Sequence, residues 1–182
     1  YRNALTLQTG LPDAEMVDVH GRFESARMVK DQRELENLRE AGRIASQVAE
    51  EIPLFLKEGM TEAEAAAEIS YRMERRGASG PAFDTVAAFG PASAEPHYSP
   101  GSVPLSRGDA ALFDFGAAVR RYRSDITRTF FSREATERQE RMYQVVLGAQ
   151  QAALEEIREG ASSVAVDAAA REFIDSTEFQ GR

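Results

Sequence analysis

Two aspartates lie in neighbouring segments that are otherwise rich in strand-forming residues. Asp114 and Asp125 are eleven positions apart in the chain. Aspartate disfavours the middle of a strand, so its presence in both segments needs a chemical reason. If the two segments pair as a hairpin centred near Val119 and Arg120, Asp114 lies directly opposite Asp125. Opposed residues of an antiparallel pair share one face of the sheet, with Cβ atoms about 4.5–5.5 Å apart.

Such a pair of carboxylates favours a metal site. Like charges in an apolar setting repel each other, so either one carboxyl group holds a proton or a cation lies between the two. A divalent ion bound by both side chains is the simplest explanation. Two alternatives stay open: both aspartates face solvent on an exposed sheet, or the register differs and they do not meet. The connection contains no Asn-Gly or Asp-Gly turn that would define the register.

A third candidate is His97, which follows Pro96 in a loop before the first of the two segments. A histidine beside a carboxylate site could donate a hydrogen bond to a substrate carbonyl or an oxyanion, and an ordinary loop residue is the alternative. The other histidine, His20, receives no role. Because the chain has two histidines and no cysteine, disulfides and thiolate chemistry are excluded. A metal site within these residues must therefore rest mostly on carboxylates.

The elements that would position these residues can be read from periodicity and caps. Capping-box spacings and apolar periodicity predict helices over about 31–59, 61–77, 136–160 and 162–175. Strand-forming runs cover 85–89, 110–117 and 122–131. Residues 1–30 are predicted to be an irregular segment, with a short strand or helix over 23–29. The pattern indicates an α+β fold with helices packed on an antiparallel sheet.

Composition limits the possible partners and location. The chain has 182 residues, of which 42% are hydrophobic and 29% are charged, which is typical of one soluble domain or a large piece of one. The net charge of −8 argues against nucleic acid and anionic membranes as partners. No apolar run is long enough to span a bilayer and no signal-peptide pattern is present, so we expect a cytoplasmic protein. Because the chain begins at Tyr1 instead of Met, we expect a fragment or a processed product.

The chain also contains a weak internal repeat. Residues 56–61 and 157–162 match in character at an offset of 101 positions, each joining a long helix to an Ala-rich helix through Glu-Gly and a hydroxyl cap. An ordinary helix–glycine–helix joint would look the same. If the repeat is real, the second unit ends where its strands should begin, and we expect the fold to be half complete in this chain.

Several ordered motifs follow one another along the chain, namely Arg27–Leu35, Phe83–Gly90, Pro96–Tyr98, Asp114–Gly116, Ser124–Thr129, Val166–Asp167 and Ala170–Arg171. Together they resemble the pita-bread metallopeptidases, the superfamily of Xaa-Pro dipeptidases, Xaa-Pro aminopeptidases, methionine aminopeptidases and creatinases. The resemblance extends over about residues 13–175 and implies that 31–182 form the N-terminal half of a pita-bread domain. It implies that 1–30 are the tail of a separate N-terminal domain.

The resemblance also implies roles for individual residues. In the superfamily, two Asp, one His and two Glu hold two divalent metal ions, and the two Asp match Asp114 and Asp125. A loop histidine that contacts substrate and stabilises the transition state matches His97, and Thr127 matches a threonine near the metals. The implied ions are Mn²⁺ or Co²⁺, with Zn²⁺ as a further candidate. No later His follows His97, so we expect an incomplete site and no activity from this stretch alone.

The motif around His97 resembles the proline-specific branch more than methionine aminopeptidases, and creatinases lack the metal-binding Asp pair. The implied activity of the full-length protein is hydrolysis of the N-terminal peptide bond of Xaa-Pro peptides by a homodimer. Two alternatives stay open. One is a non-catalytic pita-bread scaffold that binds a peptide or protein, and the other is a helix-rich interaction domain in which Asp114 and Asp125 lie far apart.

Overall fold

A computed structural model describes residues 2–15 and 17–181, so residues 1, 16 and 182 of the predicted segments lie outside it. The helices are α1 (Arg2–Gly10), α2 (His20–Met28), α3 (Gln32–Phe55), α4 (Glu62–Arg75), α5 (Glu137–Glu156) and α6 (Ser163–Asp175), with a short 3₁₀ helix η1 (Gly90–Ala94). The strands are β1 (Gly80–Pro81), β2 (Val86–Phe89), β3 (Ala110–Phe115), β4 (Ala117–Val119), β5 (Tyr122–Arg123) and β6 (Ile126–Phe131).

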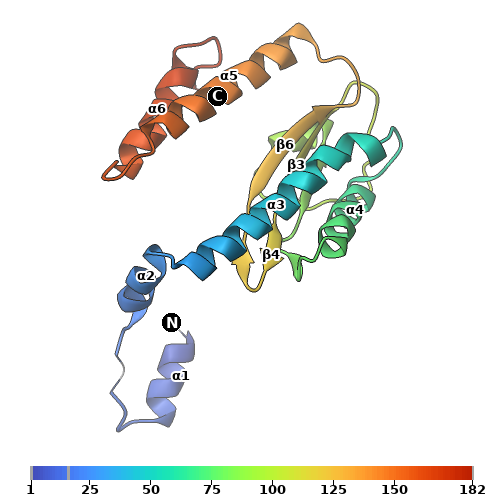
Figure 1. Cartoon of the computed structure of the whole chain (residues 1–182). Helices are drawn as coiled ribbons and strands as arrows, with labels where there is room; N and C mark the ends of the chain where they lie inside the picture. Colours follow the sequence, from blue (N-terminus) through green and yellow to red (C-terminus); the bar gives the residue numbers. More distant parts are fainter. Residues whose placement is uncertain (1, 16, 182) are drawn as a thin grey trace.

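The predicted helix starts are confirmed at three capping boxes. Asp31, Thr61 and Thr136 each accept a hydrogen bond from the backbone N–H three residues later, and each of those later side chains accepts one from the cap backbone. These reciprocal bonds satisfy backbone donors that a helix start otherwise leaves unpaired. Helices α3 and α4 lie against the sheet, while the α5–α6 hairpin projects away from it (Figure 1).

The core lies between the sheet and the pair α3 and α4. Strands β2, β3 and β6 form an antiparallel sheet in the order β2-β3-β6, and β1, β4 and β5 form a second small sheet. Along β3, Ala111, Phe113 and Phe115 are fully buried, whereas the alternate residues are only half-buried. The rings of Phe89 and Phe113 meet edge to face with centroids 6.0 Å apart. One face of the sheet is therefore core, and Asp114 lies on the other face.

The predicted hairpin register is wrong by two residues. Strand β3 pairs Asp114 with Thr127, not with Asp125. The turn is formed by Arg120 and Arg121, whose φ angles of 48° and 74° are both positive, as a type I′ turn requires. Arginine is not a residue that signals this type of turn, so the sequence pattern placed the turn too early in the chain. A register shift of two residues leaves every side chain on its predicted face of the sheet. The two aspartates therefore still share one face.

The irregular structure predicted for residues 1–30 is wrong over α1, whereas α2 agrees with the helix that was one of the two alternatives over 23–29. Helix α2 has no side-chain cap and no buried residue, so the usual sequence signals of a helix are missing. None of the described helices has both the length and the apolar composition needed to cross a membrane.

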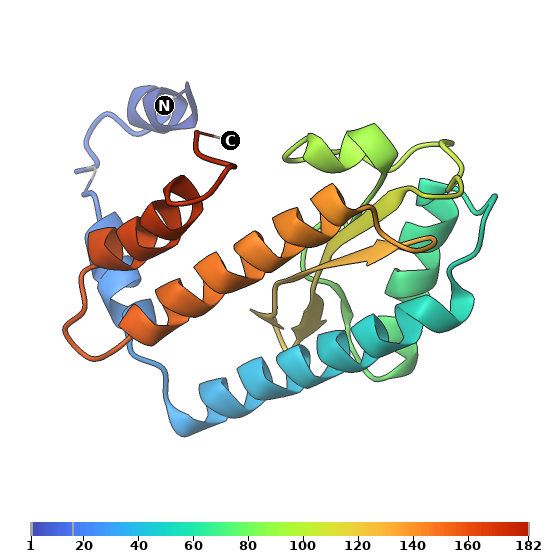
Figure 2. The same cartoon turned by 90° about the horizontal axis from the view of Figure 1, so that it is seen from above.

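The C-terminal helices α5 and α6 pack chiefly against each other. Gly148 makes this close approach feasible, because a Cβ atom there would lie 2.4 Å from the Phe173 ring. Seen from above, the axis of α5 is roughly parallel to that of α3, and the chain runs in opposite directions along the two helices (Figure 2). A hollow of about 950 Å³ separates α5 from the sheet, lined by residues of η1, β3, β6 and α5.

Candidate metal centre

The candidate centre starts from Asp114 in β3 and the residue paired with it in β6. Asp114 is half-buried, and Thr127 is its direct cross-strand partner. The Thr127 hydroxyl donates a hydrogen bond of 3.0 Å to Oδ1 of Asp114. This bond orients the carboxylate, so that the second oxygen and the remaining lone pairs of Oδ1 stay available to a cation.

Asp125 approaches the same face from the short link between β5 and β6. Its pKa is raised, first by burial, then by the negative charge of Asp114 and by a hydrogen bond with Asp114. A carboxyl group whose pKa is raised by the charge of another carboxylate, and by a hydrogen bond with it, lies close to that carboxylate. The structure therefore brings the two aspartates together, as the sequence predicted, through a diagonal instead of a direct pairing.

The backbone around Ser124 explains why the two segments meet here. The Ser124 hydroxyl donates to the carbonyl of Ala41 in α3 at 3.0 Å and accepts a hydrogen bond from the Ala117 N–H at 3.0 Å. Across the pair, a Cβ atom on Gly116 would lie 1.8 Å from the Ser124 carbonyl oxygen. Only glycine permits this approach, so Gly116 and Ser124 together determine where Asp125 lies.

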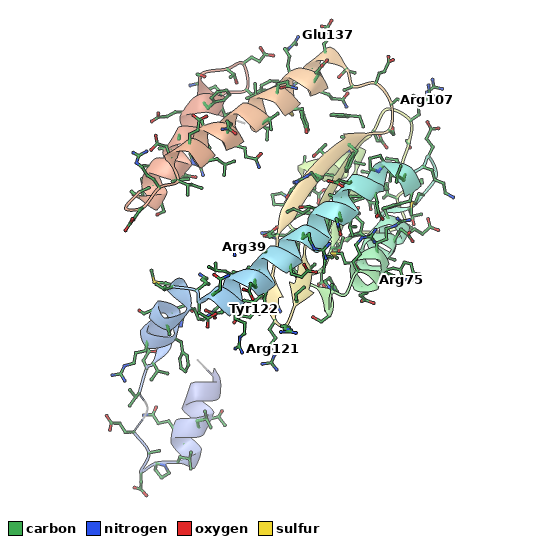
Figure 3. All side chains as sticks on the ribbon, in the orientation of Figure 1. Arg39, Arg75, Arg107, Arg121, Tyr122 and Glu137 are labelled. Carbon is green, nitrogen blue, oxygen red and sulfur yellow. The ribbon has the colours of Figure 1, made fainter. Side chains whose placement is uncertain are left out.

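A tyrosine anchors the neighbouring hairpin to α3. Tyr122 lies beside the N-terminal half of α3 (Figure 3). Its hydroxyl donates to Oε1 of Glu34 at 2.9 Å. This long-range contact and the one made by Ser124 fix the register of the hairpin, which the sequence pattern alone did not predict correctly.

His97 lies apart from the aspartates, in the segment between η1 and β3. It is exposed and has a φ angle of 61°. Among the residues that the structure describes, no three His, Asp or Glu side chains converge closely enough to hold a metal ion. His97 is therefore not a third ligand alongside Asp114 and Asp125 in this structure, and its expected role as a substrate contact stays a prediction.

One buried carboxylate was not among the residues predicted from the sequence. Glu62, the first residue of α4, is 0% exposed, and its carboxylate reaches the loop that carries His97. A glutamate in the first turn of a helix normally faces solvent and interacts with the helix dipole. No local pattern distinguishes Glu62 from that ordinary case, because its partners are distant in sequence.

Comparisons with known proteins find similarity to peptidases. The profile of Metallopeptidase family M24 matches residues 36–182. A putative dipeptidase, YkvY from Bacillus subtilis, is 36% identical over 166 residues, covering 91% of this chain and 46% of the relative. An Xaa-Pro dipeptidase from Pyrococcus furiosus is 38% identical over 148 residues, covering 81% of this chain and 42% of the relative. The chain thus spans about half the length of the curated relatives it matches.

Solved structures of peptidases are similar to this chain in fold. The X-Pro aminopeptidase from Thermotoga maritima matches with a TM-score of 0.91 and 34% identity, covering 96% of this chain and 49% of that one. The prolidase from Pyrococcus furiosus matches with a TM-score of 0.83 and 36% identity, covering 86% of this chain and 46% of that one. These matches confirm the predicted α+β arrangement of helices on an antiparallel sheet, as it occurs in about half of a pita-bread enzyme.

Proposed function

The chain belongs to metallopeptidase family M24, and from this premise we propose that the whole protein is a metal-dependent peptidase that hydrolyses the N-terminal peptide bond of Xaa-Pro substrates. The observation that carries the proposal is the pair Asp114 and Asp125 on one open face of the sheet. The similar proteins named Xaa-Pro dipeptidase, prolidase and X-Pro aminopeptidase supply the substrate class.

The two aspartates fit a divalent cation. Burial and the charge of Asp114 raise the pKa of Asp125, and a cation between the two carboxylates would remove this repulsion. Their oxygen atoms suit hard ions, which favours Mn²⁺, with Co²⁺ or Zn²⁺ as the other candidates. Since no group of three ligands converges within the described residues, Asp114 and Asp125 would form one part of a larger ligand set.

The chain's own residues have separable roles in this proposal. Asp114 and Asp125 would hold the cations, and Thr127 keeps the Asp114 carboxylate in one orientation through its hydrogen bond. Divalent ions in such a site supply Lewis-acid polarisation of the scissile carbonyl and activation of water. We assign to His97 the donation of a ring N–H to the substrate carbonyl oxygen, where negative charge develops in the transition state.

We propose that residues 1–30 belong with a separate N-terminal domain and that 31–182 form the first half of the pita-bread domain. The surface of the N-terminal segment supports this division, because α1, α2 and their links expose large apolar side chains that a soluble protein normally covers. These exposed residues are Leu7, Leu11, Val17, Val19, Phe23, Met28 and Val29. A homodimer and a cytoplasmic location stay predictions.

The test uses the full-length protein. We expect it to contain bound divalent metal by elemental analysis, and to release the first residue from Xaa-Pro dipeptides or longer Xaa-Pro peptides. Removal of the metal with a chelator should abolish turnover, and added Mn²⁺ or Co²⁺ should restore it. A protein that binds no metal and cleaves none of these peptides would instead be a non-catalytic scaffold.

A further inference from the structure

The loop that carries His97 is fastened at its base by one buried carboxylate, that of Glu62. Oε1 of Glu62 accepts a hydrogen bond of 3.0 Å from the Phe89 N–H, where β2 ends. Oε2 accepts one of 2.9 Å from the Tyr98 hydroxyl and one of 3.0 Å from the Gly101 N–H. Positions before and after His97 in the chain therefore meet at a single side chain.

The position of that side chain is itself well determined. The Glu62 N–H donates to the Val103 carbonyl at 3.1 Å, and the Ala63 N–H donates to the Gly101 carbonyl at 3.0 Å. The residue before Glu62, Thr61, forms an isolated β-bridge with Pro104. The first turn of α4 is thus joined to the loop by backbone as well as by side chain, and Glu62 has little freedom to move.

His97 depends on this arrangement because it has few contacts of its own. It is exposed, and its φ angle of 61° lies in the left-handed region, which is uncommon for a non-glycine residue. The nearest side-chain anchor is the adjacent Tyr98, held by Glu62. An exposed loop without such an anchor samples many conformations, at a cost in entropy whenever one of them is required.

The hydrogen bond from the Tyr98 hydroxyl to Glu62 is suited to hold the loop in place permanently. Hydrogen bonds to an ionised carboxylate are roughly twice as strong as those between neutral groups. The hydrogen bond to Glu62, burial, and the negative charges of Glu62 and Glu95 all raise the pKa of Tyr98. The tyrosine hydroxyl therefore keeps its proton, and stays a donor, across the neutral and mildly alkaline range.

We propose that Glu62, acting through Tyr98, is a positioning residue that holds His97 in the conformation it needs to contact substrate. The part of this inference that concerns catalysis rests on the proposed function, because it takes His97 as the substrate contact. The part that concerns the conformation of His97 stands independently of any activity.

The test compares Tyr98→Phe with wild type in the full-length protein. This change removes the bond to Glu62 but leaves both backbone bonds to the Glu62 carboxylate in place. We expect the NMR order parameter of the His97 amide to fall from about 0.85 to below 0.6. Tyr122→Phe is the matched control, since it removes the equivalent tyrosine–glutamate bond to Glu34, and it should leave His97 unchanged.

Kinetics then separate positioning from general stability. We expect Tyr98→Phe to lower kcat for Xaa-Pro hydrolysis about 10- to 100-fold with a small change in KM, because misplacement of a catalytic group has that order of effect. In a His97→Ala background the same change should have no further effect, because the two residues act as one unit. Glu62→Gln should mobilise His97 in the same way, while Glu62→Asp should do so to a smaller degree.

The outcomes are distinguishable. An unchanged order parameter for His97 in both Tyr98→Phe and Glu62→Gln would overturn the inference, as would losses in kcat that add in the double variant with His97→Ala. If the order parameter falls as expected while the wild-type protein cleaves no Xaa-Pro peptide, the positioning of His97 is supported and the proposed function fails.

Discussion

The Ser124 carbonyl oxygen occupies the space that a side chain on Gly116 would need: a Cβ atom there would lie only 1.8 Å away. This contact is between two backbone segments, so it cannot be relieved by rotation of a side chain. Asp114 lies two residues before Gly116, and Asp125 directly follows Ser124. The close approach of these two segments is therefore what places both carboxylates on one site.

Gly116→Ala should separate the two segments and weaken the site. Because the backbone must shift to accommodate a methyl group, we expect a loss of about 1–3 kcal/mol or more in unfolding free energy, together with loss of bound metal. Urea unfolding and elemental analysis of the full-length protein measure the two effects. Gly42→Ala in α3 is the matched control, since nothing lies within 4 Å of the position that its Cβ atom would take and alanine favours a helix.

Ser124→Ala should destabilise the protein through the register of the hairpin. The change removes the acceptor of the Ala117 N–H, which is left unsatisfied, and the bond to the Ala41 carbonyl, which keeps its partner within α3. We expect a loss of about 1–3 kcal/mol in unfolding free energy. Ser46→Ala, at an exposed position of α3, should change it by less than about 0.5 kcal/mol. Equal stability of the two variants would contradict this account of the register.

The elements that the sequence predicted well are those with local signals. Helices α3, α4 and α5 begin at capping boxes, whose partners lie three residues apart, so each start could be read from a few residues. Strand β3 was likewise predicted from a local run of apolar residues over 110–117, in which Phe113 and Phe115 are buried. Helix α2 has no capping box, and the sequence predicted there only a short strand or helix over 23–29.

The features that sequence reasoning missed depend on contacts between distant residues. The register of the hairpin follows from Ser124 bonding to Ala41, which lies 83 positions earlier. Glu62 is buried because its carboxylate meets Phe89, Tyr98 and Gly101, 27 to 39 positions later. The shared face of Asp114 and Asp125 was nevertheless predicted correctly, because an error of two residues in register preserves the face of a strand.

Asp125→Asn should have opposite effects on the stability of the protein with and without bound metal. The pKa of Asp125 is raised above its ordinary value of 3.8, so the folded state favours the protonated form. Stability from this group is present below pH 3.8 and is lost as pH rises through the folded-state pKa. Above that pKa the metal-free wild type carries an unfavourable charge that asparagine lacks.

We therefore expect metal-free Asp125→Asn to unfold at a higher urea concentration than metal-free wild type at pH 7, with the difference vanishing near pH 3. Adding Mn²⁺ should reverse the order, because wild type gains stability by binding the ion and the variant does not. Asp13→Asn makes the same charge change at an exposed site and should show neither effect. The metal-site interpretation of Asp125 would be wrong if Mn²⁺ stabilised both proteins equally.

Thr127→Val should weaken metal binding without disturbing the strand. Valine matches threonine in shape and favours a strand, but it cannot donate the hydrogen bond that orients Oδ1 of Asp114. Loss of such a supporting bond typically costs 10- to 100-fold in metal affinity, and we expect Mn²⁺ affinity to fall by about this factor in calorimetric titration of the metal-free full-length protein.

Two variants serve as controls. Thr127→Ser, which keeps the hydroxyl, should bind Mn²⁺ nearly as well as wild type. Thr129→Val, the same change opposite Leu112 in β6, should leave affinity unaltered. Wild-type affinity in Thr127→Val would show that Asp114 does not need this bond to act as a ligand.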